Sequence, residues 1–226
     1  IMNFSGYDTN KKFDYENGFY LTSNPSRLGK VLTHYELYKM IINLPGDIVE
    51  FGVFKGSSLI KWATFRELFE NTDSRKVIGF DIFGKFPETD FIDDMQHRDE
   101  FMKDAGEKGI SIEELHEVFE YKELQNIDLV KGDILKTAPK YIKDNPQLKI
   151  SLLHIDVDIY EPSKIILETM YDSVVEGGLI VLDDYGTFPG ETKAVDDFFR
   201  SKPVKINKFS FSQSTPVYIV KKTKKF

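Results

Sequence analysis

Five short apolar runs, separated by longer stretches with helical spacing, place the strongest limit on how this 226-residue chain can fold. Each run is rich in β-branched residues, which is typical of a buried parallel strand. Because strands that alternate with helices form parallel sheets, the pattern predicts an α/β fold. The predicted strands are 48–53, 76–83, 126–133, 149–158 and 178–185.

The two ends of the chain extend this expectation. An apolar stripe over 28–43 predicts an N-terminal helix, and 192–200 predicts a helix after the fifth strand. From Ile206 onward, two strand-like pieces are joined by a Ser/Thr/Pro turn, which predicts an antiparallel hairpin. We therefore expect a single domain over residues 1–226. It would be a three-layer α/β/α sandwich with a mostly parallel seven-stranded sheet that ends in the hairpin.

Residues 84–125 interrupt the alternation, because they form a long acidic and polar stretch after the second predicted strand. Loops longer than ~15 residues are often lids. We interpret this stretch as an inserted lid over an active site, with a plain surface excursion as the alternative. His97 lies within it, and contact with a substrate or simple lid polarity would explain that histidine equally well.

Composition excludes several classes of protein. The 37 acidic and 30 basic residues give a formal net charge of −7, which argues against a broad nucleic-acid surface. The absence of cysteine excludes a disulfide scaffold and a thiolate zinc site. No apolar run approaches the ~18 residues that would span a bilayer, and the first residues do not resemble a signal peptide. We expect a cytoplasmic protein that binds neither nucleic acid nor membranes.

The first predicted strand ends in a glycine turn, EFGVFKGSS, at the sheet edge where open α/β folds bind ligands. Gly52 and Gly56 would let a ligand approach the backbone, and the following helix offers its N–H groups. The second and third strands end in Asp81 and Asp133. An acid at such a position commonly accepts hydrogen bonds from ribose hydroxyls. Together these features favour a nucleoside site, although each acid alone is more often a helix cap.

Paired aspartates give the most specific signal in the chain. Asp156 and Asp158 end the fourth predicted strand, while Asp183 and Asp184 end the fifth. Because successive strand ends are usually neighbours, four carboxylates would converge and repel one another unless a cation or protons offset their charge. A site made only of oxygen ligands favours Mg²⁺, with Mn²⁺ or Ca²⁺ as alternatives. A set of loop-capping aspartates is the other interpretation.

The histidines carry weaker signals. His154 lies inside the fourth apolar run, where a hydrogen-bonded core histidine is more common than a ligand. Alternation along an extended strand would put it on the same side as Asp156 and Asp158. His34 and His116 are expected on helix surfaces.

These motifs resemble the class I S-adenosylmethionine (AdoMet) dependent methyltransferases and, more closely, the macrocin O-methyltransferase family. The matching blocks are LPGDIVEFGVFKGSS, GFDIFGKFP, LLHIDVDIYEPSK and GGLIVLDDYGTFPGETKAVDDFF, and they cover most of the chain. The resemblance implies a Rossmann-like methyltransferase sheet and methylation of a hydroxyl on a small, sugar-like acceptor. It also implies Mg²⁺ and, as in relatives that are commonly oligomers, a homo-oligomer.

The resemblance further implies an AdoMet site along the first three strand ends. The methionine part would lie against the glycine turn, the ribose at the second strand and the adenine at the third. The residues so implied are Glu50, Gly52, Lys55, Gly56 and Ser57 for methionine, Asp81 and Ile82 for the ribose and adenosine, and Asp133 and Ile134 for adenine.

Among the aspartates, the resemblance implies that Asp156, Asp183 and Asp184 hold Mg²⁺ and that Asp158 is the general base. The chain departs from the broad class pattern at the glycine turn, where Val53 and Lys55 replace a glycine-rich run.

Three other functions remain open at this point. LLHIDVDIY also fits the D-x-D motif of metal-dependent glycosyltransferases that use nucleotide sugars, although this leaves the Asp183-Asp184 pair and the glycine turn unexplained. Catechol-type O-methyltransferases use a similar carboxylate-bound Mg²⁺, but the aromatic gating residues they would need cannot be placed in this sequence. A non-catalytic AdoMet-binding domain would have no need of the repelling carboxylates.

Overall fold

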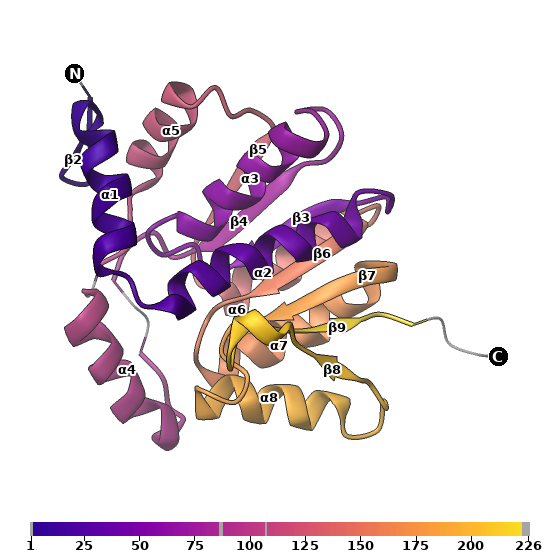
Figure 1. Ribbon diagram of the computed structural model, residues 1–226. Coiled ribbons are helices and arrows are strands. Elements are labelled where there is room, and N and C mark those ends of the chain that lie inside the picture. The colour runs from indigo at the N-terminus through magenta and orange to yellow at the C-terminus, as the bar shows by residue number, and fades with distance from the viewer. Residues whose placement is uncertain (1, 86–87, 107, 223–226) are drawn as a thin grey trace.

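A seven-stranded sheet with helices on both faces forms the body of the computed structural model, which describes residues 2–85, 88–106 and 108–222 (Figure 1). The strands follow the order β5-β4-β3-β6-β7-β9-β8. Strands β3 to β7 pair in parallel, and β9 is antiparallel to both of its neighbours. The predicted parallel sheet and C-terminal hairpin are therefore confirmed. The strands are β3 (Asp47–Phe51), β4 (Val77–Asp81), β5 (Ile127–Lys131), β6 (Ile150–Ile155), β7 (Val174–Leu182), β8 (Ile206–Asn207) and β9 (Val217–Val220).

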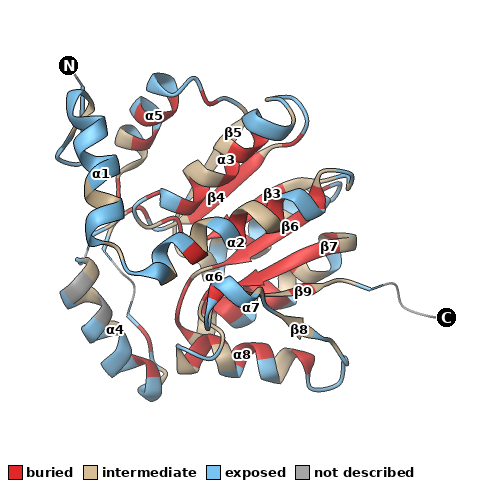
Figure 2. Cartoon of the chain, viewed as in Figure 1, coloured by how far each residue is buried: buried red, intermediate tan, exposed pale blue. Residues whose placement is uncertain are grey.

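The helices divide into two layers, and each layer has its own apolar core against one face of the sheet. Figure 2 shows the central strands as the most buried part of the chain, which fits their near-continuous apolar sequence. The predicted three-layer sandwich is confirmed. One face is covered by α2 (Pro25–Ile41), α3 (Ser57–Phe69) and α5 (Ile112–Tyr121), and the other by α6 (Ile134–Asp144), α7 (Tyr160–Met170) and α8 (Pro189–Phe199).

The register of the central strands makes three of them end in line. Phe51 of β3 pairs with Ile155 of β6, and Ile155 pairs with Leu182 of β7. Beyond this line, the Asp156 N–H donates to the Phe51 carbonyl at 2.9 Å, and the Asp183 N–H donates to the Ile155 carbonyl at 2.9 Å. The residues that follow the three strands therefore meet at one edge of the sheet.

Gly52 shows how tightly two of these strand ends approach. Its φ of +90° is a conformation that side chains disfavour, and an added Cβ would lie 1.6 Å from the Asp156 carbonyl oxygen. Glycine is thus required at this turn both by conformation and by space.

The N-terminal helix predicted over 28–43 is α2, which begins slightly earlier at Pro25. Asn24 caps it by accepting a hydrogen bond from the Ser26 N–H at 3.1 Å. Before it lie α1 (Lys12–Thr22) and a small ribbon of β1 (Asn3–Phe4) and β2 (Tyr7–Asp8), which the sequence pattern does not predict. Since α1 buries none of its residues, it has no apolar stripe to detect.

The expected lid over 84–125 consists of two unlike helices, α4 (Ile92–Ala105) and α5. The interpretation is wrong for α5, because Leu115, Val118 and Phe119 are buried residues of the body of the protein. Their spacing is that of a core-facing helix. For α4 the cover role stays a prediction, and residues 86–87 and 107 lie outside the described part. Among the described helices, none combines the length and the apolar character that a membrane span requires.

Candidate functional site

Three carboxylates converge where β6 and β7 end. Asp156, Asp158 and Asp184, here called the aspartate trio, each offer an oxygen atom within 4.8 Å of the others. They line a hollow of about 360 Å³, together with polar residues from both ends of the chain such as Ser26 and Gln213. The predicted convergence of aspartates from neighbouring strand ends is therefore present.

Asp158 joins the trio through an unusual backbone conformation. Its φ of +62° lies in the left-handed region, which costs a non-glycine residue ~1–3 kcal/mol. Simple strand alternation does not describe its position, because β6 already ends at Ile155. Such local strain persists only where the surrounding structure holds it, and it is common at functional sites.

The trio is electrostatically unfavourable without a cation. Burial and then the charge of Asp156 raise the pKa of Asp158 to about 7. Burial and then Asp183 raise the pKa of Asp156 to about 6. Burial and the charge of Asp158 raise the pKa of Asp184 well above its usual value. Within the described residues, the buried Oδ2 atom of Asp184 has no hydrogen-bond partner. An oxygen-only cluster with an unpartnered acceptor fits a hard divalent cation such as Mg²⁺.

Asp183 lies beside the trio but has partners of its own. Its carboxylate binds the ammonium of Lys30 from α2 and lies 3.3 Å from Nε2 of His154. Burial alone would raise the pKa of Asp183, but Lys30 and His154 hold it well below the usual range. The implied metal ligands were Asp156, Asp183 and Asp184, whereas the structure groups Asp158 with Asp156 and Asp184. Asp183 also lines the hollow, and its role as a ligand stays a prediction.

Glu50 belongs to the same buried chain of contacts. Oε2 of Glu50 lies 3.4 Å from Nδ1 of His154, and the Ser58 hydroxyl donates to Oε1 at 3.2 Å. Burial opposes protonation of His154, but Asp183 and Glu50 raise its pKa to about 10. His154 is thus the core histidine expected from its place in an apolar strand. We call Glu50, His154, Asp183 and Lys30 the paired network.

The expectation that His34 lies on a helix surface is wrong. His34 is fully buried, and its ring lies 4.5 Å from that of Trp62 and 5.3 Å from that of His154. Burial lowers its pKa well below 6.5, so the ring is neutral. The period of the buried residues Leu37, Tyr38 and Ile41 on α2 also includes position 34, and this was the missed signal.

The rest of the glycine turn forms the entry to α3. Gly56 precedes the helix with a φ of +79°, and Ser57 is its exposed first residue. Nζ of Lys55 donates to the Ala105 carbonyl at 2.6 Å, at the end of α4. Contact of these residues and Glu50 with the methionine part of AdoMet stays a prediction.

The acids after β4 and β5 hold local structure. The Asp81 carboxylate accepts from the Phe54 N–H at 2.9 Å and from the Phe83 N–H at 2.7 Å. Asp133 caps α6 by accepting from the Leu135 N–H at 3.0 Å. Capping is thus real at these positions, and their roles toward ribose and adenine stay predictions. The adjoining side chains are the exposed Ile82 and the half-buried Ile134.

Two charged residues near the site are not among the site residues that the family resemblance implies. Lys30 lies 3.7 Å from Asp156, in addition to its contact with Asp183. Glu191 is fully buried at the start of α8, where its Oε1 accepts from the Asp184 N–H at 3.0 Å. Lysine and glutamate are usually exposed on helices, so a single sequence gives no sign of these positions.

The strand order and the position of the site at the strand ends define a methyltransferase of the class I fold. In agreement, the chain is similar to the crystal structure of CalS11, a calicheamicin methyltransferase, with a TM-score of 0.77 and 26% identity. The similarity covers 96% of this chain and 86% of that one.

The family model described as Macrocin-O-methyltransferase (TylF) matches residues 32–215, which include the glycine turn and the whole aspartate trio. The chain belongs to this family.

Two curated relatives come from Streptomyces. Demethyldecarbamoylnovobiocin O-methyltransferase of Streptomyces niveus is 27% identical over 69% of this chain. The 8-demethyl-8-(2,3-dimethoxy-alpha-L-rhamnosyl)-tetracenomycin-C 4'-O-methyltransferase of Streptomyces olivaceus is 26% identical over 63% of it. The matches span 59% and 54% of the lengths of these relatives.

Proposed function

We propose that this protein is a Mg²⁺-dependent O-methyltransferase that uses AdoMet to methylate a hydroxyl of a sugar or a sugar-bearing natural product. The observation that carries the proposal is the aspartate trio, beside a glycine turn, in a chain of the macrocin O-methyltransferase family. Repulsion among the trio's carboxylates destabilises a purely structural site. A cation site needs several carboxylates close together, and the bound cation offsets their repulsion.

The grouping of the trio's oxygen atoms indicates which residues would hold a divalent cation. Asp156 and Asp184 would bind it, and Asp183 lines the same hollow. A bound divalent cation lowers the pKa of an acceptor hydroxyl. Gly52 and Gly56 leave room for AdoMet against the backbone of the turn.

Asp158 is the general base in this proposal. Its carboxylate has an oxygen atom within 4.8 Å of those of Asp156 and Asp184, so it would lie within reach of an acceptor hydroxyl held beside the cation. When bound, AdoMet would supply the methyl group to the hydroxyl oxygen, with S-adenosylhomocysteine as the other product, and Asp158 would accept the proton that the hydroxyl gives up. The protein orients the two reactants and keeps water away from the buried base.

The lining of the hollow supports a hydroxyl-rich acceptor. Besides the acids, it presents Ser26, Gln213, Ser214 and Thr215, which can exchange hydrogen bonds with sugar hydroxyls. One of the relatives is named for methylation of a compound that bears a rhamnosyl group. These two facts together favour a glycosylated acceptor over a catechol.

Calorimetric titration separates this proposal from the glycosyltransferase alternative. The protein is titrated with S-adenosylhomocysteine and with UDP-glucose, each with and without Mg²⁺. We expect micromolar binding of S-adenosylhomocysteine and no response to UDP-glucose. Metal-dependent binding of UDP-glucose, without any response to S-adenosylhomocysteine, would overturn the proposal.

A pair of substitutions shows whether the cofactor lies at the turn. Ser57→Leu enlarges the exposed first residue of α3, so it leaves the buried turn intact, and it should weaken binding of S-adenosylhomocysteine. Gly18→Ala on α1 meets nothing within 4 Å and should bind it as the wild type does.

A further inference from the structure

A single carboxylate of α4 joins the first turns of two other helices. Asp94 is fully buried although it lies in the first turn of a largely exposed helix. Its Oδ2 accepts from the Tyr160 N–H at 3.0 Å, and its Oδ1 accepts from the Gly190 N–H at 2.7 Å. The neighbouring Asp93 is exposed, so burial is particular to position 94.

The two N–H groups belong to helix ends that have no side-chain cap of their own. Tyr160 is the first residue of α7 and Gly190 the second of α8. The residues before these helices, Ile159 and Phe188, make no side-chain capping bond. Because the first N–H groups of a helix need acceptors and its N-terminus favours negative charge, Asp94 serves both ends at once.

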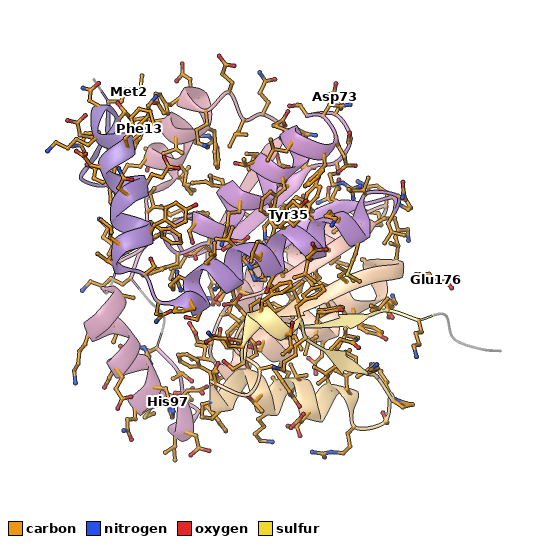
Figure 3. The ribbon with its side chains drawn as sticks, viewed as in Figure 1. Met2, Phe13, Tyr35, Asp73, His97 and Glu176 are labelled. Atoms are coloured by element: carbon orange, nitrogen blue, oxygen red, sulfur yellow. The ribbon has the colours of Figure 1, made fainter. Side chains whose placement is uncertain are left out.

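Other contacts hold the start of α4 in the same place. The rings of Phe91 and Tyr160 stack at 5.4 Å, and the Thr89 hydroxyl donates to Glu161 at 3.1 Å. His97, labelled on α4 in Figure 3, places its ring 5.9 Å from that of Phe188. The start of α4 is therefore docked on α7 and α8.

Gly190 makes this close approach possible. An added Cβ at position 190 would lie 2.0 Å from Oδ2 of Asp94 and 2.5 Å from the Tyr160 nitrogen. A side chain there would displace the carboxylate from between the two helices.

Both helices continue directly from the loops that carry the aspartate trio. Asp158 lies two residues before α7, and Asp184 lies in the loop that leads into α8. The Glu191 N–H donates to the Asp158 carbonyl at 3.1 Å, so the first turn of α8 contacts the loop that carries Asp158. A group that fixes the starts of α7 and α8 therefore also fixes the separation of these loops.

We propose that Asp94 is a positioning residue for the trio: by binding the N-termini of α7 and α8 together, it holds the loops that carry Asp156 and Asp184 at the separation that cation binding requires. This inference rests on the proposed function. Phe188 lines the hollow, so the same docking brings α4 to the edge of the acceptor site.

Mn²⁺ affinity, measured by calorimetry or electron paramagnetic resonance on the purified protein, tests the proposal. We expect Asp94→Ala to weaken Mn²⁺ binding about 10–100-fold, as loss of outer-shell support does at other metal sites. Binding of S-adenosylhomocysteine, measured without metal, should stay within about twofold of wild type, because the hydrogen bonds of the Asp94 carboxylate go to α7 and α8 and not to the glycine turn. The control Asp93→Ala removes an exposed acid from the same turn and should leave both affinities unchanged.

Two further variants keep the test valid if Asp94→Ala fails to fold. Asp94→Asn retains one acceptor and should weaken Mn²⁺ binding by a smaller factor. Gly190→Ala keeps the carboxylate but displaces it, and should reproduce the loss seen in Asp94→Ala. The rate of backbone hydrogen exchange at the start of α4 should rise in Asp94→Ala and Gly190→Ala but not in the other variants.

The outcomes separate the two proposals. If the wild type binds neither S-adenosylhomocysteine nor Mn²⁺, the proposed function itself fails. If the wild type binds both and the folded Asp94 variants bind Mn²⁺ with unchanged affinity, the positioning role of Asp94 is refuted while the function stands. A parallel loss of both affinities would show general damage to the fold and would also refute the specific role.

Discussion

Two groups of charged residues lie next to each other near the ends of β6 and β7, and they differ in how their charges are balanced. In the paired network, Asp183 contacts Lys30 and His154, and Glu50 contacts His154 and Ser58. In the aspartate trio, no basic side chain among the described residues pairs with Asp158 or Asp184. The charges of the paired network balance one another, whereas the negative charge of the trio needs a cation from outside the chain. The adjacent residues Asp183 and Asp184 fall on opposite sides of this division.

The largest effect is expected at the base. Asp158→Asn keeps the shape of the side chain but cannot accept the proton, so turnover should fall about 10²–10⁴-fold. Release of S-adenosylhomocysteine in the presence of a rhamnosylated acceptor measures it, and binding of S-adenosylhomocysteine should persist. Normal turnover in this variant would remove Asp158 from the mechanism.

Substitution of the two adjacent aspartates tests the comparison directly. Asp184→Ala should abolish measurable Mn²⁺ binding but leave the fold intact, because it relieves repulsion in the trio. Asp183→Asn should instead destabilise the fold by about 3–5 kcal/mol, because it breaks a buried ion pair and leaves Lys30 without its main partner. Chemical denaturation and Mn²⁺ titration of both variants decide the matter. Equal effects on the two measurements would erase the distinction between the groups.

Lys30 contacts both Asp183 of the paired network and Asp156 of the trio. Its removal should increase the difference in charge balance between the two groups. Without its positive charge near Asp156, the affinity of the trio for Mn²⁺ should rise by up to about tenfold in Lys30→Met. Lys39→Met, an exposed change on the same helix, is the control and should have no effect. A fall in Mn²⁺ affinity would instead show that Lys30 supports the bound cation.

The smallest effect concerns pH. Folding raises the pKa of Asp156 to about 6 and that of Asp158 to about 7, so each acid binds its proton more tightly in the folded state. Stability is then lost as pH rises from about 4, the ordinary value for aspartate, through these folded values. Asp183 has the opposite shift and acts only below that range.

We therefore expect the melting temperature of the metal-free protein to fall by a few degrees between pH 5 and pH 8. Excess Mg²⁺ at pH 8 should restore it, because a cation replaces the protons. If excess Mg²⁺ leaves the melting temperature at pH 8 unchanged, the charge imbalance assigned to the trio is contradicted.

The sequence predicted the parts of the molecule that depend on repeated local patterns. The strand–helix alternation and the hairpin follow from the period and composition of the apolar runs. The convergence of the aspartates follows from the rule that parallel strands end at one edge. The buried residues of α5, and those of α2 that include His34, also recur at helical spacing, so the sequence held a detectable sign of their burial.

What the sequence could not predict depends on side-chain partners brought together by the fold. The sequence predicts that Asp158 joins the cluster of aspartates, but it does not predict the left-handed backbone that Asp158 adopts there. The pairing of Asp183 with Lys30 joins positions 153 residues apart. Asp94 is one of several acids in a polar stretch, and only the folded chain shows that it lies between two helix ends.

Two sets of residues line the hollow, and they differ in how much substitution they tolerate. Its acids come from the ends of the central strands, where the register and the close contact at Gly52 tolerate little change. Its polar rim comes from Ser26 and from Gln213, Ser214 and Thr215, near the two ends of the described chain. Under the proposed function, substitutions in the rim would change which acceptor is methylated, whereas substitutions among the acids would change whether a methyl group is transferred at all.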